Sequence, residues 1–300
     1  MSNPSTASMT PLKLEDYQSP EYSTWCPGCG DFPILKCLKE SLMAQGIGPH
    51  QVLIVSGIGC GSKLPYYIKA NGFNSLHGRS LPIAQAIKLT NHALKVVAVT
   101  GDGDGLGIGG NHFIHAMRRN PDITHVIENN QIYALTKGQA SPTSDKGFIT
   151  STSPDGSIEQ AVNPLVLGIA CGATFIARTS SGDPKHLIET ITRGMKHKGY
   201  SLIDVLQPCV TFNKINTYQW YKQRIYNVEI QPGYKPADRE WAFSKALEWG
   251  DKIPVGVIYQ NTTLPTYEDQ VPALKELPLV QQEFNGRVRQ DAEKLKESFC

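Results

Sequence analysis

Short apolar runs alternate with segments of helical periodicity through the first two thirds of the chain. Apolar residues recur at helical spacing from Ile34 to Leu42, and Val52–Val55 that follows is a short continuous run, typical of a buried strand. The same alternation continues as far as residue 206. The pattern predicts helices at 34–42, 82–89, 110–119, 164–171 and 184–196, and strands at 52–55, 95–100, 123–127, 174–177 and 202–206.

Strands separated by helices indicate an α/β fold, in which a mainly parallel sheet is covered by helices on both faces. Ligands of such sheets bind beyond the carboxyl ends of the strands. Four residues with metal-binding or thiol chemistry each follow a predicted strand. They are Cys60, Asp102, Asn130 and Cys209. We therefore expect these four side chains at one rim of the sheet.

The segment from Gly101 to Asn130 carries the clearest chemical signal. A predicted strand ends in Gly101-Asp-Gly-Asp-Gly105, whose backbone N–H groups can approach phosphate oxygens, and the next helix points its positive N-terminus at them. A carboxylate beside a diphosphate is repulsive unless a divalent cation lies between them. Asp102 and Asn130 supply the oxygen ligands that Mg²⁺ accepts. The segment therefore predicts a site for a metal-bound diphosphate.

Two other interpretations of this segment remain open at this point. Gly105, Gly107 and Gly110 satisfy the G-x-G-x-x-G pattern of dinucleotide sites, and Glu128 lies roughly where a ribose-binding acid would fall. Asp102 argues against this interpretation, because a dinucleotide site without metal has no use for a negative charge directly after the strand. In the other interpretation, the glycines only form a tight turn.

Four of the seven cysteines stand beside or close to Gly or Pro, which leaves the backbone open enough for thiolates to converge. They are Cys26, Cys29, Cys60 and Cys209. Four convergent thiolates suit a [4Fe–4S] cluster or a structural zinc, and the C-x₂-C pair alone also fits a redox dithiol. On spacing alone, zinc is the commoner user of this pair. Cys37 and Cys171 lie in apolar segments and are expected to be buried, whereas Cys300 ends a charged tail.

The composition and charge of the chain bear on its partners, its core and its location. The formal net charge is +2 and the basic residues are spread along the chain, so neither nucleic acid nor an anionic membrane is indicated as a partner. With 300 residues, 40% of them hydrophobic, the chain can bury a sizeable core. No run of about 18 apolar residues occurs, and Met1–Thr10 lacks the apolar core of a signal peptide. We expect a cytoplasmic protein with reduced thiols.

Gly101-Asp-Gly103 followed by Asn129-Asn130 resembles the thiamine diphosphate signature, and the continuation over 131–143 resembles the β subunit of 2-oxoacid:ferredoxin oxidoreductases. The similarity covers most of residues 20–260. The resemblance implies a thiamine diphosphate-binding fold in which Asp102, Asn130 and the backbone carbonyl of Ile132 hold Mg²⁺. It also implies that Cys26, Cys29, Cys60 and Cys209 hold one [4Fe–4S] cluster, which reverses the preference for zinc.

Further site residues follow from the same resemblance. Those expected to bind the cofactor are His77, Gly101, Asp102, Gly103, Asp104, Asn130, Ile132, Leu135 and Thr136. Lys63 matches a family lysine near the substrate carboxylate, and Lys137 lies in a long loop, 134–157, that we expect to cover the cofactor. These two are the candidate catalytic residues. The alternatives are that Lys63 is an ordinary surface lysine and His77 a structural histidine.

The implied reaction is oxidative decarboxylation of a 2-oxoacid with CoA, giving acyl-CoA, CO₂ and reduced ferredoxin, or its reversal as a reductive carboxylation. Residues 255–280 favour 2-oxoglutarate, with succinyl-CoA as product; pyruvate or a broad range of 2-oxoacids is the alternative. In this family an α subunit supplies the carboxylate that activates the aminopyrimidine ring. The chain is therefore expected to need an α subunit, in an α2β2 heterotetramer.

Two hypotheses from other classes remain. One is a thiamine diphosphate decarboxylase without electron transfer, in which the cysteines are incidental or bind zinc. The other is a non-catalytic electron-transfer subunit that binds a cluster but no diphosphate.

The expected organisation has three parts. Residues 1–20 form an N-terminal arm, residues 21–212 form the diphosphate-binding domain with the cluster ligands, and residues 213–300 form a C-terminal extension. The extension is rich in aromatic residues, Trp220 and Trp249 among them. We expect these aromatic side chains to pack against the sheet or against a partner.

Overall fold

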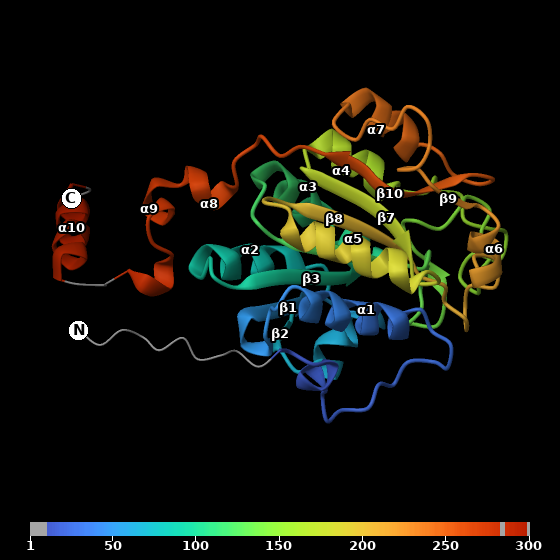
Figure 1. Cartoon of the computed structure of the whole chain (residues 1–300), viewed down its shortest axis with the longest axis horizontal. Helices are drawn as coiled ribbons and strands as arrows, with labels where there is room; N and C mark the ends of the chain where they lie inside the picture. The colour runs from blue at the N-terminus through green and yellow to red at the C-terminus, as the bar shows by residue number, and fades with distance from the viewer. Residues whose placement is uncertain (1–10, 283–285, 299–300) are drawn as a thin grey trace.

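The apolar runs of the sequence pair as neighbouring strands of one eight-stranded sheet (Figure 1). Residues 11–282 and 286–298 are described by a computed structural model of the chain. The strands of the sheet are β1 (Val52–Ser56), β2 (Asn71–Asn74), β3 (Lys95–Gly101), β4 (Thr124–Asn129), β7 (Phe175–Ser180), β8 (Ser201–Leu206), β9 (Ile225–Asn227) and β10 (Ile253–Gln260). Their order is β2-β1-β3-β4-β8-β7-β10-β9, and only β7 and β10 pair antiparallel. A separate hairpin joins β5 (Ile132–Tyr133) to β6 (Gln139–Ala140).

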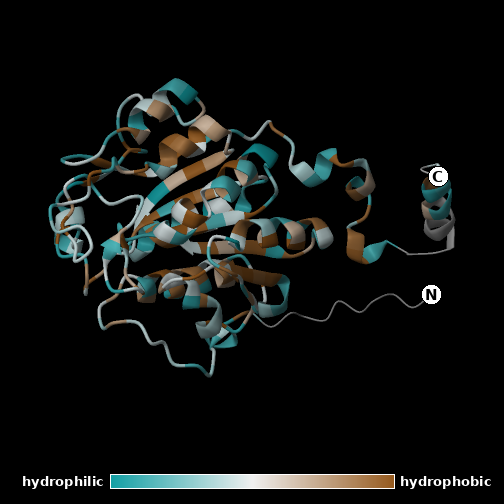
Figure 2. Ribbon diagram, turned by 180° about the vertical axis from the view of Figure 1, so that it is seen from behind, coloured by the Kyte–Doolittle hydropathy of each residue, from teal (hydrophilic) through white to brown (hydrophobic). Residues whose placement is uncertain are grey.

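Helices cover both faces of the sheet, whereas α8, α9 and α10 lie away from it (Figure 1). The helices are α1 (Asp31–Ala44), α2 (Ser80–Thr90), α3 (Gly110–Arg119), α4 (Pro164–Cys171), α5 (Pro184–Lys196), α6 (Tyr218–Lys222), α7 (Arg239–Ala246), α8 (Tyr267–Gln270), α9 (Pro272–Lys275) and α10 (Gly286–Glu297). One apolar core lies between the sheet and α1 with α5, and a second lies between the sheet and α2, α3, α4 and α7. Along β3, Val97 and Val99 enter the first core while Val96 and Ala98 enter the second. In Figure 2 the central strands are accordingly largely hydrophobic, and the helices carry both polar and apolar residues.

The predicted α/β architecture is confirmed. Each of the five predicted helices and five predicted strands is present, with ends that differ by three residues or fewer. The parallel sheet with helices on both faces follows the prediction as well. Local apolar periodicity is sufficient here because these strands are buried on both faces and their helices bury one face.

The part of the chain after residue 212, which we predicted to be an extension, contributes strands β9 and β10 to the sheet. Strand β10 pairs antiparallel with β7 and parallel with β9, so it lies inside the sheet. The sequence pattern did not predict this strand, because it contains Pro254 and Gly256, two residue types that are unfavourable within strands. The aromatic residues pack within this region: Trp220 contacts Tyr221 and Trp249. The boundaries at residues 20 and 212 stay predictions.

Several smaller expectations can be compared with the structure. Of the predicted N-terminal arm, residues 11–20 are described, and there Tyr17 is buried and donates a hydrogen bond to the carbonyl of Ile47. Cys37 is buried as expected, whereas Cys171 is only half-buried. Cys300 lies outside the described residues. No helix in the described part of the chain has both the length and the apolar character needed to cross a membrane.

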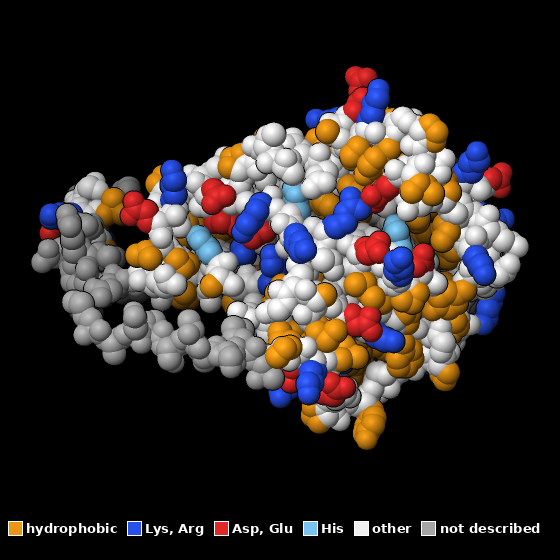
Figure 3. Space-filling model, viewed as in Figure 1, with side chains coloured by type: hydrophobic (Ala, Val, Ile, Leu, Met, Phe, Trp, Pro, Cys, Tyr) orange, Lys and Arg blue, Asp and Glu red, His pale blue; other side chains and the backbone are white. Residues whose placement is uncertain are grey.

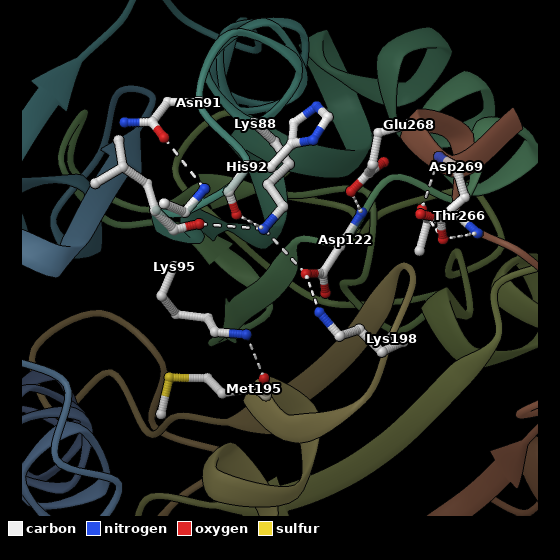
Figure 4. Close-up of polar contacts among 12 residues, drawn as sticks. Lys88, Asn91, His92, Lys95, Asp122, Met195, Lys198, Thr266, Glu268 and Asp269 are labelled. Atoms are coloured by element: carbon white, nitrogen blue, oxygen red, sulfur yellow. Dashed lines mark hydrogen bonds and ion pairs between the residues drawn. The ribbon is translucent and has the colours of Figure 1, made fainter. Parts of the chain in front are cut away.

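Charges of both signs are interspersed over the face shown in Figure 3, and hydrophobic side chains gather on its lower right, in the region of α1. A buried polar cluster lies at the amino end of β4 (Figure 4). The carboxylate of Asp122 contacts the Nζ atoms of Lys88 at 3.0 Å and Lys198 at 3.5 Å. The backbone N–H of Asp122 donates to Glu268 at 3.0 Å, which fastens the C-terminal segment to the sheet.

This cluster predicts an acid-sensitive contribution to stability. Burial by itself raises the pKa of Asp122, but attraction to Lys88, Lys95 and Lys198 outweighs it and lowers the pKa. A carboxyl whose pKa is lowered on folding stabilises the protein above its unfolded pKa of about 3.9, and this stabilisation is lost as the pH falls through the folded pKa. We expect Asp122→Asn to cost about 3 kcal/mol at pH 7, since it leaves Lys88 buried and unpaired. Urea denaturation at pH 7 and below pH 4 measures both effects.

The matched control is Lys198→Ala, because the Lys198 side chain is 81% exposed and its contact with Asp122 is worth no more than about 1 kcal/mol. Relative to the unchanged chain, Asp122→Asn should lose less stability on acidification. An equal loss in both proteins would show that Asp122 is not the acid-sensitive group.

Candidate active site

Four adjacent strands bring the chemically significant residues together. Strands β1, β3, β4 and β8 are neighbours and run parallel. The segments that follow them carry Cys60, Asp102, Asn130 and Cys209, and therefore leave the sheet at the same rim. The expectation of a shared rim is confirmed.

The first of two pockets at this rim is the predicted diphosphate pocket. Its wall contains every residue that we expected to bind the cofactor. These residues are His77, Gly101, Asp102, Gly103, Asp104, Asn130, Ile132, Leu135 and Thr136. The remaining wall includes Ile58, Tyr133 and Ala134, which give it an apolar side. The structure thus gathers the whole predicted set, from three separate segments, round one cavity.

Asp102 is one of three buried carboxyls in the wall of this pocket, with 1% of its surface exposed. Thr143 Oγ1 donates to Asp102 Oδ2 at 2.5 Å, and the hydroxyl of Ser141 donates to the same oxygen. Burial raises the pKa of Asp102 to about 6, although the two hydroxyl groups act in the opposite direction. A buried carboxylate in such a setting is stabilised by a cation at its free oxygen.

Ser141 and Thr143 were not predicted. They lie just after the β5–β6 hairpin, inside the long segment that we expected to cover the cofactor, and the Ser-Pro-Thr run was the only sequence signal for them. Residues 134–136 of the same segment line the pocket. The segment therefore both forms part of the wall and fixes the orientation of Asp102.

Asp104 has a different environment from Asp102. Its Oδ1 atom accepts hydrogen bonds from the backbone N–H of Gly78 at 2.7 Å and of Ile58 at 3.0 Å, and lies 2.7 Å from His77 Nδ1. The carboxylate thereby holds two loops, one after β1 and one before α2, against the pocket. His77 lines the pocket with its ring fixed by this contact.

The glycine-rich segment after β3 is helical. Residues Gly103–Ile108 form a π-helical turn that leads directly into α3. Tyr133 packs on the turn and donates to the carbonyl of Gly103 at 3.1 Å. Such turns are rare and occur frequently at functional sites.

Two glycines of the Gly57-Ile-Gly-Cys-Gly61 segment are required by close contacts. A Cβ atom at Gly57 would lie 1.9 Å from the carboxylate of Asp104, and one at Gly61 would lie 1.2 Å from Glu128 Oε2. Asp104 and Glu128 are both buried, so neither side chain can move far enough to accommodate such a methyl group. The glycines therefore make room for two buried acids.

The second pocket contains the four predicted cysteine ligands. Cys26, Cys29, Cys60 and Cys209 all line it, and it shares Cys60, Asn130 and Ala134 with the diphosphate pocket. Burial raises the pKa of the Cys60 thiol to about 11, and burial together with Asp31 raises the pKa of Cys29 further. Within residues 11–282 and 286–298, no three His, Cys, Asp or Glu side chains are arranged to hold a single metal ion.

The two candidate catalytic lysines lie outside the wall of the diphosphate pocket. Lys63 lines the cysteine pocket, where its Nζ atom donates to Thr24 Oγ1 at 3.0 Å. Lys137 is exposed and takes a positive φ of 87° in the turn after Thr136. The structure therefore places Lys63 in the neighbouring cysteine pocket and Lys137 directly after Thr136, at the edge of the diphosphate pocket.

A buried pair of acids, Asp31 and Glu128, lies between the two pockets. Each side chain is 1% exposed, and the four carboxyl oxygens have no hydrogen-bond donor among the described residues. Burial raises the pKa of Asp31 to about 7, and burial with the charge of Asp31 raises the pKa of Glu128 well above its usual range. The carboxyl of Glu128 is thus buried beside Asp31, in the wall of the diphosphate pocket.

Comparisons with known proteins identify the fold and the family. A family model described as the C-terminal TPP-binding domain of thiamine pyrophosphate enzymes matches residues 46–205, and one described as the C-terminal part of the pyruvate ferredoxin oxidoreductase β subunit matches residues 209–276. A 2-oxoacid:ferredoxin oxidoreductase β subunit from Sulfolobus sp is 45% identical over 85% of this chain and 87% of its own. The chain belongs to this family of β subunits.

Two further relatives refine the comparison. The 2-oxoglutarate oxidoreductase subunit KorB of Mycobacterium tuberculosis is 44% identical over 68% of this chain and 54% of its own. A solved structure of 2-oxoglutarate:ferredoxin oxidoreductase from Magnetococcus marinus, with 2-oxoglutarate, coenzyme A and succinyl-CoA bound, superposes with a TM-score of 0.88 at 35% identity, covering 95% of this chain and 97% of that one.

Membership of the family bears on the interpretations of the glycine segment. The protein is the β subunit of a 2-oxoacid:ferredoxin oxidoreductase with a thiamine pyrophosphate-binding domain, which argues against the dinucleotide interpretation. The same finding replaces the hypotheses of a non-redox decarboxylase and of a subunit without diphosphate. A β subunit functions with an α subunit, in agreement with the expected need for a partner.

Proposed function

We propose that this β subunit, joined to an α subunit, oxidatively decarboxylates 2-oxoglutarate with CoA to succinyl-CoA and CO₂, and passes the electrons through a [4Fe–4S] cluster to ferredoxin. The observation that carries the proposal is the shared wall of the two pockets. Cys60, Asn130 and Ala134 line both the diphosphate pocket and the cysteine pocket. A cofactor and a cluster held there would be direct neighbours. The reverse reaction, a reductive carboxylation, uses the same arrangement.

The donors at the diphosphate pocket fit Mg²⁺ and a diphosphate. Asp102, Asn130 and the carbonyl of Ile132 would hold the metal, since carboxylate, amide and carbonyl oxygens are its preferred protein ligands and all three residues line the pocket. The side chain of Asn130 is oriented by a hydrogen bond, because its Oδ1 atom accepts from the backbone N–H of Ile132 at 3.1 Å. Thiamine diphosphate, when bound, stabilises the carbanion formed on decarboxylation.

The chain's own residues shape the surroundings of the reaction. Ser141 and Thr143 hold Asp102 in place, and Asp104 fixes His77 and the loop that carries Ile58. Tyr133, Ala134 and Leu135 give the pocket an apolar wall that limits the access of water. Lys63 and Lys137 are proposed to contact the anionic substrates, Lys63 from the cysteine pocket and Lys137 from the exposed turn.

The four thiols of the cysteine pocket suit a [4Fe–4S] cluster, because the cluster offers a separate iron to each thiolate. Cys26, Cys29, Cys60 and Cys209 would therefore each bind one corner of the cluster. A structural zinc, which holds its thiolates at about 2.3 Å from one ion, is the alternative.

The relatives support 2-oxoglutarate as the substrate, because the names of several of them, the KorB subunits and the solved structure, state it. Relatives named only for 2-oxoacids make pyruvate or a broad range of 2-oxoacids the second candidate substrate.

We propose an α2β2 heterotetramer in the cytoplasm. The chain itself supplies the metal and cluster ligands, and the α subunit the remaining part of the active site.

The metal site predicts that Asp102→Asn removes Mg²⁺-dependent binding of thiamine diphosphate. Changes to outer-shell partners of a metal cost about 10–100-fold in affinity, so loss of a direct anionic ligand should cost at least about 100-fold. Isothermal titration of the α–β complex, with Mg²⁺ and with a chelator, measures the change. Asp155→Asn, which changes an exposed aspartate of the long segment 134–157, is the control. Unchanged binding by Asp102→Asn would refute the proposed metal site.

The cysteine pocket predicts iron and acid-labile sulfide in equal amounts in the complex purified without oxygen. Cys60→Ser should lower both, because it removes a cluster ligand that also borders the diphosphate pocket, whereas Cys171→Ser, a half-buried cysteine of α4, should leave both unchanged. Metal analysis with a sulfide assay gives the answer. Zinc without sulfide would exclude the redox function proposed here.

The substrate is tested by an anaerobic assay of the α–β complex with CoA, ferredoxin and either 2-oxoglutarate, pyruvate or a branched 2-oxoacid. We expect the highest kcat/KM with 2-oxoglutarate and no turnover by the β subunit alone. A higher kcat/KM with pyruvate would assign the protein to the second candidate. Turnover by the isolated β subunit would contradict the need for the α subunit.

A further inference from the structure

A buried amide lies against one of the four cysteines. Gln207 is 1% exposed, and its Nε2 atom donates to the sulfur of Cys29 at 3.3 Å. Cys29 is itself buried. The cysteine pocket is lined by Gln207 as well as by the four thiols, so the amide belongs to the wall of this pocket.

The backbone fixes the position of this amide. Gln207 directly follows β8, and its N–H donates to the carbonyl of Asn129 at 2.9 Å, which continues the pairing of β4 with β8 by one residue. The side chain reaches Cys29 only because position 30 is a glycine: a Cβ atom there would lie 2.7 Å from Gln207 Cγ. The amide is therefore held at the sulfur by the sheet on one side and by Gly30 on the other.

The chemistry of a cluster ligand selects the orientation of the amide. A thiolate bound to iron has no proton and can only accept a hydrogen bond, so the NH₂ end of Gln207 is the end that stabilises it. Each reduction adds negative charge to the cluster and its sulfurs. A donor to a ligand sulfur therefore stabilises the reduced form more than the oxidised form.

We propose that Gln207 is a positioning residue that raises the reduction potential of the cluster bound at Cys29. This inference rests on the proposed function, because it requires the cluster. The proposed role concerns electron transfer. Loss of the donated N–H should change the reduction potential of the cluster but not the iron content, whereas loss of a merely structural glutamine would not change the potential.

The test is a redox titration of the α–β complex, followed by electron paramagnetic resonance, after iron and sulfide have been measured. Gln207→Leu removes the donor, and we expect about a tenfold shift of the reduction equilibrium toward the oxidised cluster, which is about 59 mV for a one-electron couple. Gln207→Glu keeps the shape and should shift the potential in the same direction. Gln85→Leu is the control, since Gln85 is also buried but donates within α2.

Two results would overturn the inference. One is a Gln207→Leu protein with full iron content and an unchanged potential. The other needs no variant: the unchanged complex, labelled with ¹⁵N in glutamine side chains, should show a hyperfine coupling of one amide nitrogen to the reduced cluster, and the absence of that coupling would contradict the contact. Absence of iron from the unchanged complex would instead refute the proposed function, so the two failures are distinguishable.

Discussion

The parallel pairing of β1, β3, β4 and β8 is the constraint on which the site depends. Because parallel strands end at the same rim, residues that are far apart in the sequence leave the sheet side by side. Cys60, Asp102, Asn130 and Cys209 meet in this way, each one to four residues beyond its strand. A different order of these strands in the sheet would separate the residues of the cysteine pocket from those of the diphosphate pocket.

The rim concentrates buried acids, and this is costly for the folded chain. Asp31, Asp102, Asp104 and Glu128 are almost fully buried, and no Lys or Arg side chain forms an ion pair with them among the described residues. Burial raises the pKa of Asp31 and Asp102. Such clusters are typical of sites where a cation or a proton supplies the missing charge. The opposite rim shows the contrast, because there Asp122 is paired with lysines.

The shared wall of the two pockets gives the protein a short path between the two kinds of chemistry expected of its family. Cys60 and Asn130 each belong to both pockets, one as a predicted cluster ligand and one as a predicted metal ligand. The sheet rather than a flexible loop sets their separation. Gln207 extends the same principle, since the end of β8 positions an amide on Cys29.

The sequence by itself determined the alternation of helices and strands and the rim residues, because apolar periodicity and the glycine, aspartate and cysteine motifs are local properties. Other residues round the diphosphate pocket, such as His77 and Leu135, came from the family resemblance. Only the tertiary structure decided how these residues are supported. The contacts of Ser141 and Thr143 with Asp102, the pairing of Asp31 with Glu128, and the place of β10 beside β7 join segments that are distant in the sequence. No local pattern encodes such contacts, because they form only when the sheet brings those segments together.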